Sequence, residues 1–299
     1  MKKMTKLSAL VLALAMMFAL ASCGSNGAAS SKGGASSAPA TSGTTSGSAS
    51  GADASAADND AESDLSYVKD KGTLVVGITD FEPMDYQDES GEWVGFDADM
   101  ARAFAESLGV DVEFVEINWD NKILELNNKS IDCVWNGMTL TDEVTSSMEC
   151  SNAYMNNTQV VVVPQDKADI DTIELMQSEF SFAVESGSAG EAQAQKFEFT
   201  YTPVGAQADA LMEVAAGTSD AAIIDSLMAG AMVGEGTGYP DLVYTVSLNE
   251  SEGEQYGVGF RKGSDLAAAL NDFFSASYAD GSMAQTAETY GVQAALIEQ

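Results

Sequence analysis

The chain contains no histidine, and positive charge is scarce: 13 lysines and arginines stand against 46 aspartates and glutamates, for a net charge of −33. The missing imidazole excludes Ser-His and Cys-His catalytic pairs and His-ligated metal sites. A strongly negative field repels nucleic acid and anionic lipid headgroups. We therefore expect no catalytic residue, no metal, no cofactor and no nucleic-acid partner.

Cysteine is also rare, with Cys23, Cys133 and Cys150 as the only three. Cys133 lies inside an apolar run, and a bridge to Cys150 would close a short loop. Sequence cannot bring the two thiols into contact, so a disulfide stays open as an alternative. Buried free thiols are the interpretation that we favour.

The first 22 residues have the composition of a secretory signal peptide. Three lysines precede an apolar run from Leu7 to Ala21, which is too short to span a bilayer. The tetrapeptide LASC, residues 20–23, resembles a lipobox, after which Cys23 carries lipid. We expect Cys23 to anchor the protein to the cell membrane, facing the extracellular side or the periplasm.

Residues 23–64 form a predicted linker between this anchor and the folded part. Over Gly24–Ser63 no aliphatic residue is larger than alanine and no residue is aromatic. Such a segment buries too little apolar area to offset its chain entropy. We expect a flexible tether with an r.m.s. span of roughly 30–40 Å.

After the linker, apolar runs and helical periodicities alternate in a βαβαβ order. Such an order predicts a parallel sheet with helices on its faces. The expected strands are 73–78, 112–117 and 131–135, and the expected helices are 97–108, ended by Gly109, and 120–126.

The same rhythm then repeats, with strands over 159–163, 180–184 and 221–224 and helices over 188–196 and 208–216. The closing segment, with a strand at 256–260 and helices over 266–278 and 284–290, has no third sheet to join. We predict an α/β fold of two lobes, 65–162 plus 248–299 and 163–247. Two hinge crossings, near Val161–Gln165 and Val246–Asn249, would join them around a cleft.

Ligands of open α/β sheets bind outside the carboxyl ends of the strands. Four segments follow predicted strands at those ends: Thr79–Asp85, Trp135–Thr141, Glu185–Gly190 and Asp225–Ser226. We expect all four to meet at the cleft.

These segments belong to a longer series of motifs. In order they are GTLVVGI, GEWVGFDADMARAFAESLG, INWDNKILELNNKSIDCVWNGMTLTDE and SNAYMNNTQVVVV, then ESGSAG, SDAAIID and EQYGVGFRKGSDL. The series resembles the extracellular solute-binding proteins of polar amino-acid ABC importers. The resemblance implies a periplasmic-binding-protein-like fold, a small polar ligand held between lobes, a monomer, and a permease and an ATPase subunit as partners.

The resemblance also implies ligand contacts at the turn after the third strand, at Asn136, Gly137 and Thr139. The Gly137 carbonyl would meet the ligand ammonium, and Thr139 would meet its carboxylate. Read without the other motifs, Asn136-Gly137 is an ordinary turn dipeptide. Phe81 would pack on the ligand side chain, or it is a core aromatic, whereas Trp119 and Trp135 are expected in the core.

In the second lobe, Ser188 and Ala189 open a helix whose free N–H groups could receive a carboxylate, although simple helix capping explains them too. Asp225 matches the family's ammonium partner, and its alternative role is a helix cap. Asp80 and Glu185 complete the predicted set of ligand residues.

Val144 departs from the family pattern, which places an arginine there to clamp the ligand carboxylate. Three explanations stay open. Lys122 supplies the charge, although it could equally be a solvated surface lysine; the helix that starts at Ser188 suffices; or the ligand is a cation or neutral polar solute and not an α-amino acid.

We predict a binding protein that delivers a small polar solute, an amino acid or close analogue, to a permease. The chain has no phosphate-binding G-x-x-x-x-G-K-[ST] motif, so a separate ATPase would drive release. A sensor subunit for a membrane receptor and a dehydratase-like enzyme on the same fold are the alternatives.

Overall fold

The structure is a computed structural model that describes residues 63–249 and 253–299. The predicted signal peptide, Cys23 and nearly all of the predicted linker lie outside these residues. Within them, no helix is long and apolar enough to cross a membrane.

The first lobe is built on a five-stranded sheet in the order β4-β1-β5-β14-β6. Strands β4, β1 and β5 run parallel, as the βαβαβ order predicts, and β14 and β6 each pair antiparallel with their neighbour. Because β14 comes from the end of the chain, the expected return to the first lobe is confirmed. The strands are β1 (Thr73–Ile78), β4 (Asp111–Glu116), β5 (Cys133–Val134), β6 (Glu149–Cys150) and β14 (Gly259–Phe260).

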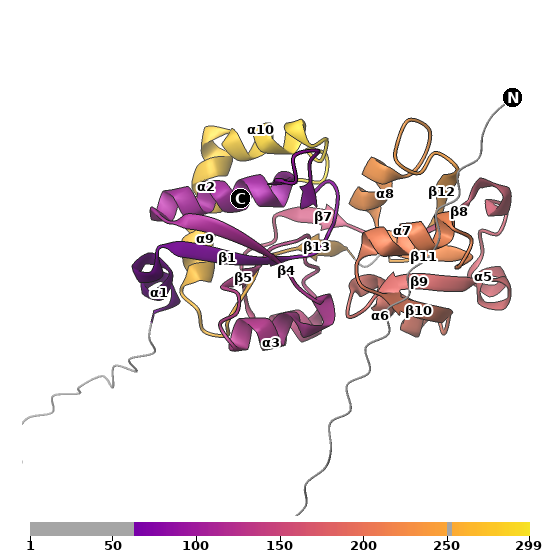
Figure 1. Cartoon of the computed structure of the whole chain (residues 1–299), viewed down its shortest axis with the longest axis horizontal. Coiled ribbons are helices and arrows are strands. Elements are labelled where there is room, and N and C mark those ends of the chain that lie inside the picture. Colours follow the sequence, from indigo (N-terminus) through magenta and orange to yellow (C-terminus); the bar gives the residue numbers. More distant parts are fainter. Residues whose placement is uncertain (1–62, 250–252) are drawn as a thin grey trace, which may run out of the picture. The chain divides into compact units, whose positions relative to one another are not determined.

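Helices cover both faces of this sheet, with α2 and α3 on opposite sides in Figure 1. The helices are α1 (Asp64–Lys71), α2 (Phe96–Leu108), η1 (Trp119–Asn121), α3 (Lys122–Asn127), α4 (Asp142–Ser147), α9 (Leu266–Asp280) and α10 (Ser282–Thr289). A small hairpin precedes α2, made of β2 (Tyr86–Gln87) and β3 (Trp93–Val94).

Helix α1 was not predicted, and polar contacts fasten it to the end of the chain. Its N-terminal Ser63 donates to Asp265 Oδ2 at 2.5 Å, and the Leu65 amide donates to Asp265 Oδ1 at 2.8 Å. The buried Arg261 guanidinium binds both oxygens of Asp64, at 3.0 and 3.1 Å, and reaches Asp132 at 3.5 Å.

The second lobe repeats the design with the order β10-β9-β11-β8-β12. Strands β9, β10 and β11 run parallel, and β8 and β12 are antiparallel additions. The elements are β8 (Gln159–Pro164), η2 (Gln165–Lys167), α5 (Ile173–Glu179), β9 (Ser181–Glu185), α6 (Ala189–Lys196), β10 (Thr200–Val204), α7 (Gln207–Ala215), β11 (Ala221–Asp225), α8 (Ser226–Met232) and β12 (Leu242–Ser247).

The chain passes between the lobes through the antiparallel pair β7 (Met155–Asn157) and β13 (Glu254–Tyr256). All of β8 belongs to the second sheet, from Gln159 onward. The expected first crossing near Val161–Gln165 is therefore wrong, because a continuous apolar run does not mark where a chain changes lobes. The return passage follows β12 and so lies close to the expected Val246–Asn249.

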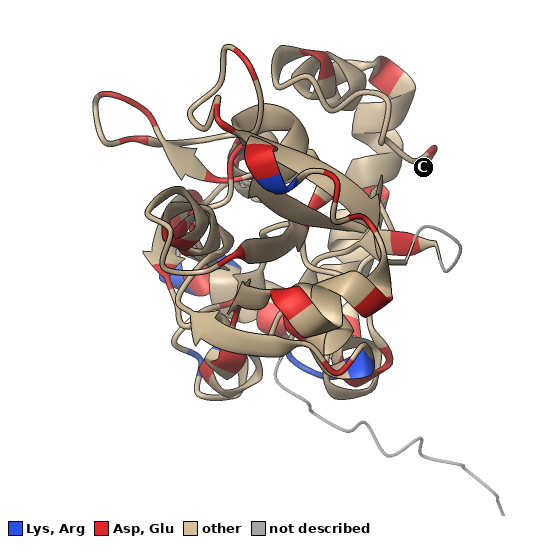
Figure 2. Cartoon of the chain, turned by 90° about the vertical axis from the view of Figure 1, so that its right-hand side faces the viewer, with Lys and Arg blue, Asp and Glu red and all other residues tan. Residues whose placement is uncertain are grey.

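Acidic residues are spread over the described part of the chain, whereas basic residues are few (Figure 2). Cys133 and Cys150 are free, and the antiparallel strand β14 lies between the strands that carry them. The interpretation as free thiols is confirmed; Cys133 is buried and Cys150 is half-buried.

Candidate ligand-binding site

A cavity of about 220 Å³ lies where the carboxyl ends of strands from both sheets meet. This volume corresponds to about seven water molecules, so it suits a ligand smaller than a typical drug. Its walls come from the first lobe and the second lobe alike. The lining residues are Trp119, Lys122, Asn136, Gly137, Met138, Thr139, Thr141, Asp142, Glu143, Val144, Glu185, Gly187, Ser188, Ala189, Ala192, Gln207 and Asp225.

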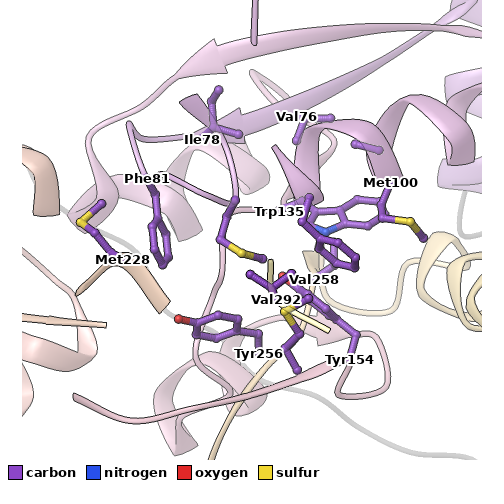
Figure 3. Close-up of a cluster of buried hydrophobic side chains, with 14 of the residues drawn as sticks. Val76, Ile78, Phe81, Met100, Trp135, Tyr154, Met228, Tyr256, Val258 and Val292 are labelled. Carbon is purple, nitrogen blue, oxygen red and sulfur yellow. The ribbon is translucent and has the colours of Figure 1, made fainter. Parts of the chain in front are cut away.

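Eight of the ten predicted ligand residues line this cavity, and Asp80 and Phe81 do not. The Phe81 ring is 1% exposed and packs edge-on against Tyr256, with 6.3 Å between ring centroids. Figure 3 shows it inside the hydrophobic cluster, with Met228 and Tyr256 nearby. Its alternative interpretation as a core aromatic therefore describes its position.

Asp80 is solvent-exposed. Partial desolvation, Glu116 and Asp209 together raise the pKa of its carboxyl.

Polar groups of the first lobe hold the Asn136-Gly137 turn through hydrogen bonds. The Asn136 amide accepts from the Thr79 N–H and hydroxyl at 3.0 and 2.9 Å, and donates to the Thr79 carbonyl at 2.9 Å and to Asp85 at 2.8 Å. The Gly137 N–H donates to the buried Asp97 carboxylate at 2.7 Å. These contacts direct the Asn136 side chain into the lobe, so a ligand contact at this turn would come from the backbone, as expected for the Gly137 carbonyl.

Glycine at position 137 is required by both conformation and space. Its φ of +55° lies in the left-handed region, and a Cβ there would lie 2.5 Å from Phe81 Cε1. Phe81 therefore contributes to the site indirectly, because it holds the turn in place.

Asp225 ends β11 and is 3% exposed. Its carboxylate accepts from the side-chain amides of Asn157, Gln159 and Gln207. Burial, followed by the nearby Glu254 carboxylate, raises the pKa of Asp225 to about 7. A carboxylate offers about four lone-pair sites, and three are used, so one remains for a ligand N–H.

Two of these amides also connect Asp225 to β13, one of the strands that pass between the lobes. Asn157 and Gln159 also donate to Glu254 Oε1, at 2.6 and 2.8 Å. The Thr139 hydroxyl donates to that oxygen at 2.9 Å, so its proton is not available to a ligand carboxylate in this arrangement. Sequence reasoning missed Glu254 and Gln207 because nothing local distinguishes them from surface polar residues.

Glu185 ends β9 with 2% of its surface exposed, and its Oε1 atom has no hydrogen-bond partner. Burial raises the pKa of Glu185 to about 8, with a further upward contribution from Asp225. The Thr79 hydroxyl and Lys122 oppose this rise. The carboxyl is therefore largely protonated at neutral pH.

Lys122 is the only lysine or arginine among the described residues that line the cavity. It is 7% exposed, which excludes the solvated surface lysine that was its alternative interpretation. Its ammonium donates to the Gly187 carbonyl of the second lobe at 2.9 Å and to the Trp119 carbonyl at 3.1 Å. Burial lowers the pKa of Lys122, against the attraction of Glu185 and other acids.

Val144 contributes an apolar wall where the family pattern has arginine. It is 4% exposed and packs in a cluster with Trp119, Met138 and Met148. On the opposite wall, the Ser188 hydroxyl caps α6 by accepting from the Glu191 N–H at 3.1 Å. Helix capping, the alternative role of Ser188, is therefore present, and its contact with a ligand stays a prediction.

Comparison with known proteins matches residues 74–293 to bacterial extracellular solute-binding proteins, family 3. The L-arginine-binding protein of Pseudomonas aeruginosa is 28% identical over 236 residues, which cover 75% of this chain and 90% of that protein.

Solved structures agree with this match. A substrate-binding protein of an ABC uptake transporter from Streptococcus pneumoniae, with bound histidine, superposes with a TM-score of 0.69 at 29% identity, covering 78% of this chain and 98% of that one. An ancestral amino acid-binding protein, described as a precursor of cyclohexadienyl dehydratase, gives 0.69 at 31% identity, covering 76% and 99%. With the family match extending over most of both lobes, the chain belongs to the bacterial extracellular solute-binding proteins of family 3.

Proposed function

We propose that this protein captures a small polar solute with an ammonium group, an amino acid or close analogue, and delivers it to an ABC importer. The observation that carries the proposal is the cavity lined by both lobes, in which the Asp225 carboxylate keeps one acceptor site. One relative is named an L-arginine-binding protein, and another was solved with bound histidine. Both support an amino-acid ligand.

Ligand contacts from both lobes favour the closed arrangement, because only there can one solute touch Asp225 and the Gly137 turn together. Closure also removes water, which strengthens the short polar contacts. The closed complex would dock on a permease, and a separate ATPase would drive release.

We further propose that the chain acts as a monomer outside the cell, attached through lipid on Cys23, and that it catalyses no reaction. The family supports an extracellular binding role. Recovery of a bound ligand unchanged after long incubation tests the absence of catalysis. Genes for a permease and an ATPase next to this gene would separate transport from the alternative role as a receptor's sensor subunit.

A thermal-shift screen of the twenty amino acids and simple amines tests the proposal. Stabilisation should follow RT ln(1 + [L]/Kd), about 2.7 kcal/mol at a hundredfold excess over Kd. Asp225→Asn should remove the shift, whereas Asp169→Asn, an exposed aspartate of the same lobe, should retain it. Equal shifts in wild-type and Asp225→Asn protein would exclude Asp225 from the site, and no shift with any solute would refute the proposed function.

A further inference from the structure

Glu185 is a buried polar group of the cavity that the proposed capture of one ammonium does not use. Its side chain is almost fully buried, and one carboxyl oxygen has no partner. Such an atom costs stability unless something binds to it. Glu185 lines the cavity, and no group among the described residues donates to this oxygen, so a ligand that enters the cavity could supply the missing donor.

The charge balance of the cavity indicates what that donor is. Four acidic residues line it, whereas Lys122 is the only base among its described residues, and two of the ammonium's three donors are already used by backbone carbonyls. The remaining wall at Val144 is apolar, so no guanidinium is present to neutralise a ligand carboxylate. The excess of acidic over basic residues favours a positively charged ligand, whose charge would also stabilise the ionised forms of Glu185 and Asp225.

Glu185 and Asp225 are placed to act on two ends of one small molecule. They end the adjacent parallel strands β9 and β11, so both carboxyl groups leave the sheet at the same edge. Asp225 also raises the pKa of Glu185, so the two carboxyls are neighbours, and a small molecule with an amine at each end of a short aliphatic chain can contact both.

We infer that Glu185 determines specificity by accepting a second positive charge of the ligand, so that the site takes small organic dications, namely diamines and diamino acids. The inference rests on the proposed function, because Asp225 supplies the first ammonium contact. A ligand carboxylate is tolerated next to Lys122 but is not required.

Binding of such a ligand is linked to pH through the groups that face Glu185. These are Asp225, Asp209 and Lys122, and the Thr79 hydroxyl also lies near the carboxyl. A cation must displace the proton that Glu185 holds at neutral pH, so binding releases protons and affinity rises between about pH 6 and pH 8. If Glu185 instead donated its proton to a ligand carboxylate, affinity would fall above pH 8.

Isothermal titration calorimetry tests the inference with three probes of similar size: 1,4-diaminobutane, ornithine and norvaline. Ornithine and diaminobutane should bind at least about tenfold more tightly than norvaline, the neutral analogue, because a hydrogen bond to a charged group has that effect. Glu185→Gln should remove this preference. Glu174→Gln, an exposed glutamate of the same lobe, should keep it.

The outcomes separate this inference from the function on which it rests. Norvaline that binds as tightly as ornithine, a preference that survives in Glu185→Gln, or affinity that falls with pH overturns the role of Glu185 while capture itself stands. If no probe and no amino acid binds, both fail. The pH series uses the unaltered protein, so it decides the question even if the variant does not fold.

Discussion

Replacing Glu185 by glutamine should stabilise the ligand-free protein, and by an amount that grows with pH. In the folded protein the pKa of Glu185 is raised from 4.5 to about 8, mainly by burial. The folded chain therefore holds a proton that the unfolded chain has released throughout this interval. Stability is lost as pH rises from about 4.5, and the loss is complete above pH 8.

The size of the effect follows from that displacement. At 1.36 kcal/mol for each tenfold change in proton affinity, the ionised carboxyl costs about 5 kcal/mol above pH 8. Glutamine avoids this cost but leaves an amide atom unpaired, which costs about 1–3 kcal/mol. We expect Glu185→Gln to be more stable than the wild type by about 2–4 kcal/mol at pH 8.5, and equal or less stable at pH 4.5.

Urea unfolding followed by circular dichroism at pH 4.5, 6, 7.5 and 8.5 measures this difference. Asp97, whose pKa is also raised to about 7 by burial, is present in both proteins and cancels in the comparison. Glu174→Gln controls for loss of one negative charge from the surface. A stability difference that stays constant from pH 4.5 to pH 8.5 would refute the reasoning, since it would mean that Glu185 does not change its charge in this range.

Two further substitutions test the supports of the site. Gly137→Ala should lower the free energy of unfolding by about 2–4 kcal/mol, because the new Cβ would meet Phe81. Gly72→Ala, also at positive φ but with open space around it, should lower it by about 1 kcal/mol. Equal losses of the two variants in chemical unfolding would contradict the steric argument. Arg261→Met should lower the free energy of unfolding by about 3–5 kcal/mol, because Asp64 and Asp132 lose their buried partner. The exposed Lys262→Met should lower it by about 1 kcal/mol or less. A thermal midpoint shift no larger for Arg261→Met than for Lys262→Met would contradict this role of Arg261.

The strands and the polar residues at their ends were predictable because their signals are local. Apolar runs such as 73–78 and 221–224 are continuous, and Asp225 follows one of them directly. The carboxyl-end rule predicts that the segments with Gly137, Ser188 and Asp225 meet, and all three residues line one cavity.

Features that depend on distant parts of the chain were not predictable. Helix α1 has one fully buried apolar residue, Val68, and its fastening comes from Arg261 and Asp265 at the far end of the chain. The burial of Glu185, and the carboxylate pair of Asp225 and Glu254 that shares two amides, arise only when the sheets and crossing strands assemble. No local pattern identifies them.

The fastening of α1 would have a mechanical consequence if the protein is held through lipid on Cys23, as proposed. A force applied to the chain before Ser63 would act first on the hydrogen bonds to Asp265 and on the ion pair of Arg261 with Asp64. It would therefore act on the lobe that contains the C-terminal helices. The other half, which carries Glu185 and Asp225, stays out of that line of force. The proposed attachment therefore acts on the first lobe, whereas the wall of the cavity formed by Glu185 and Asp225 belongs to the second.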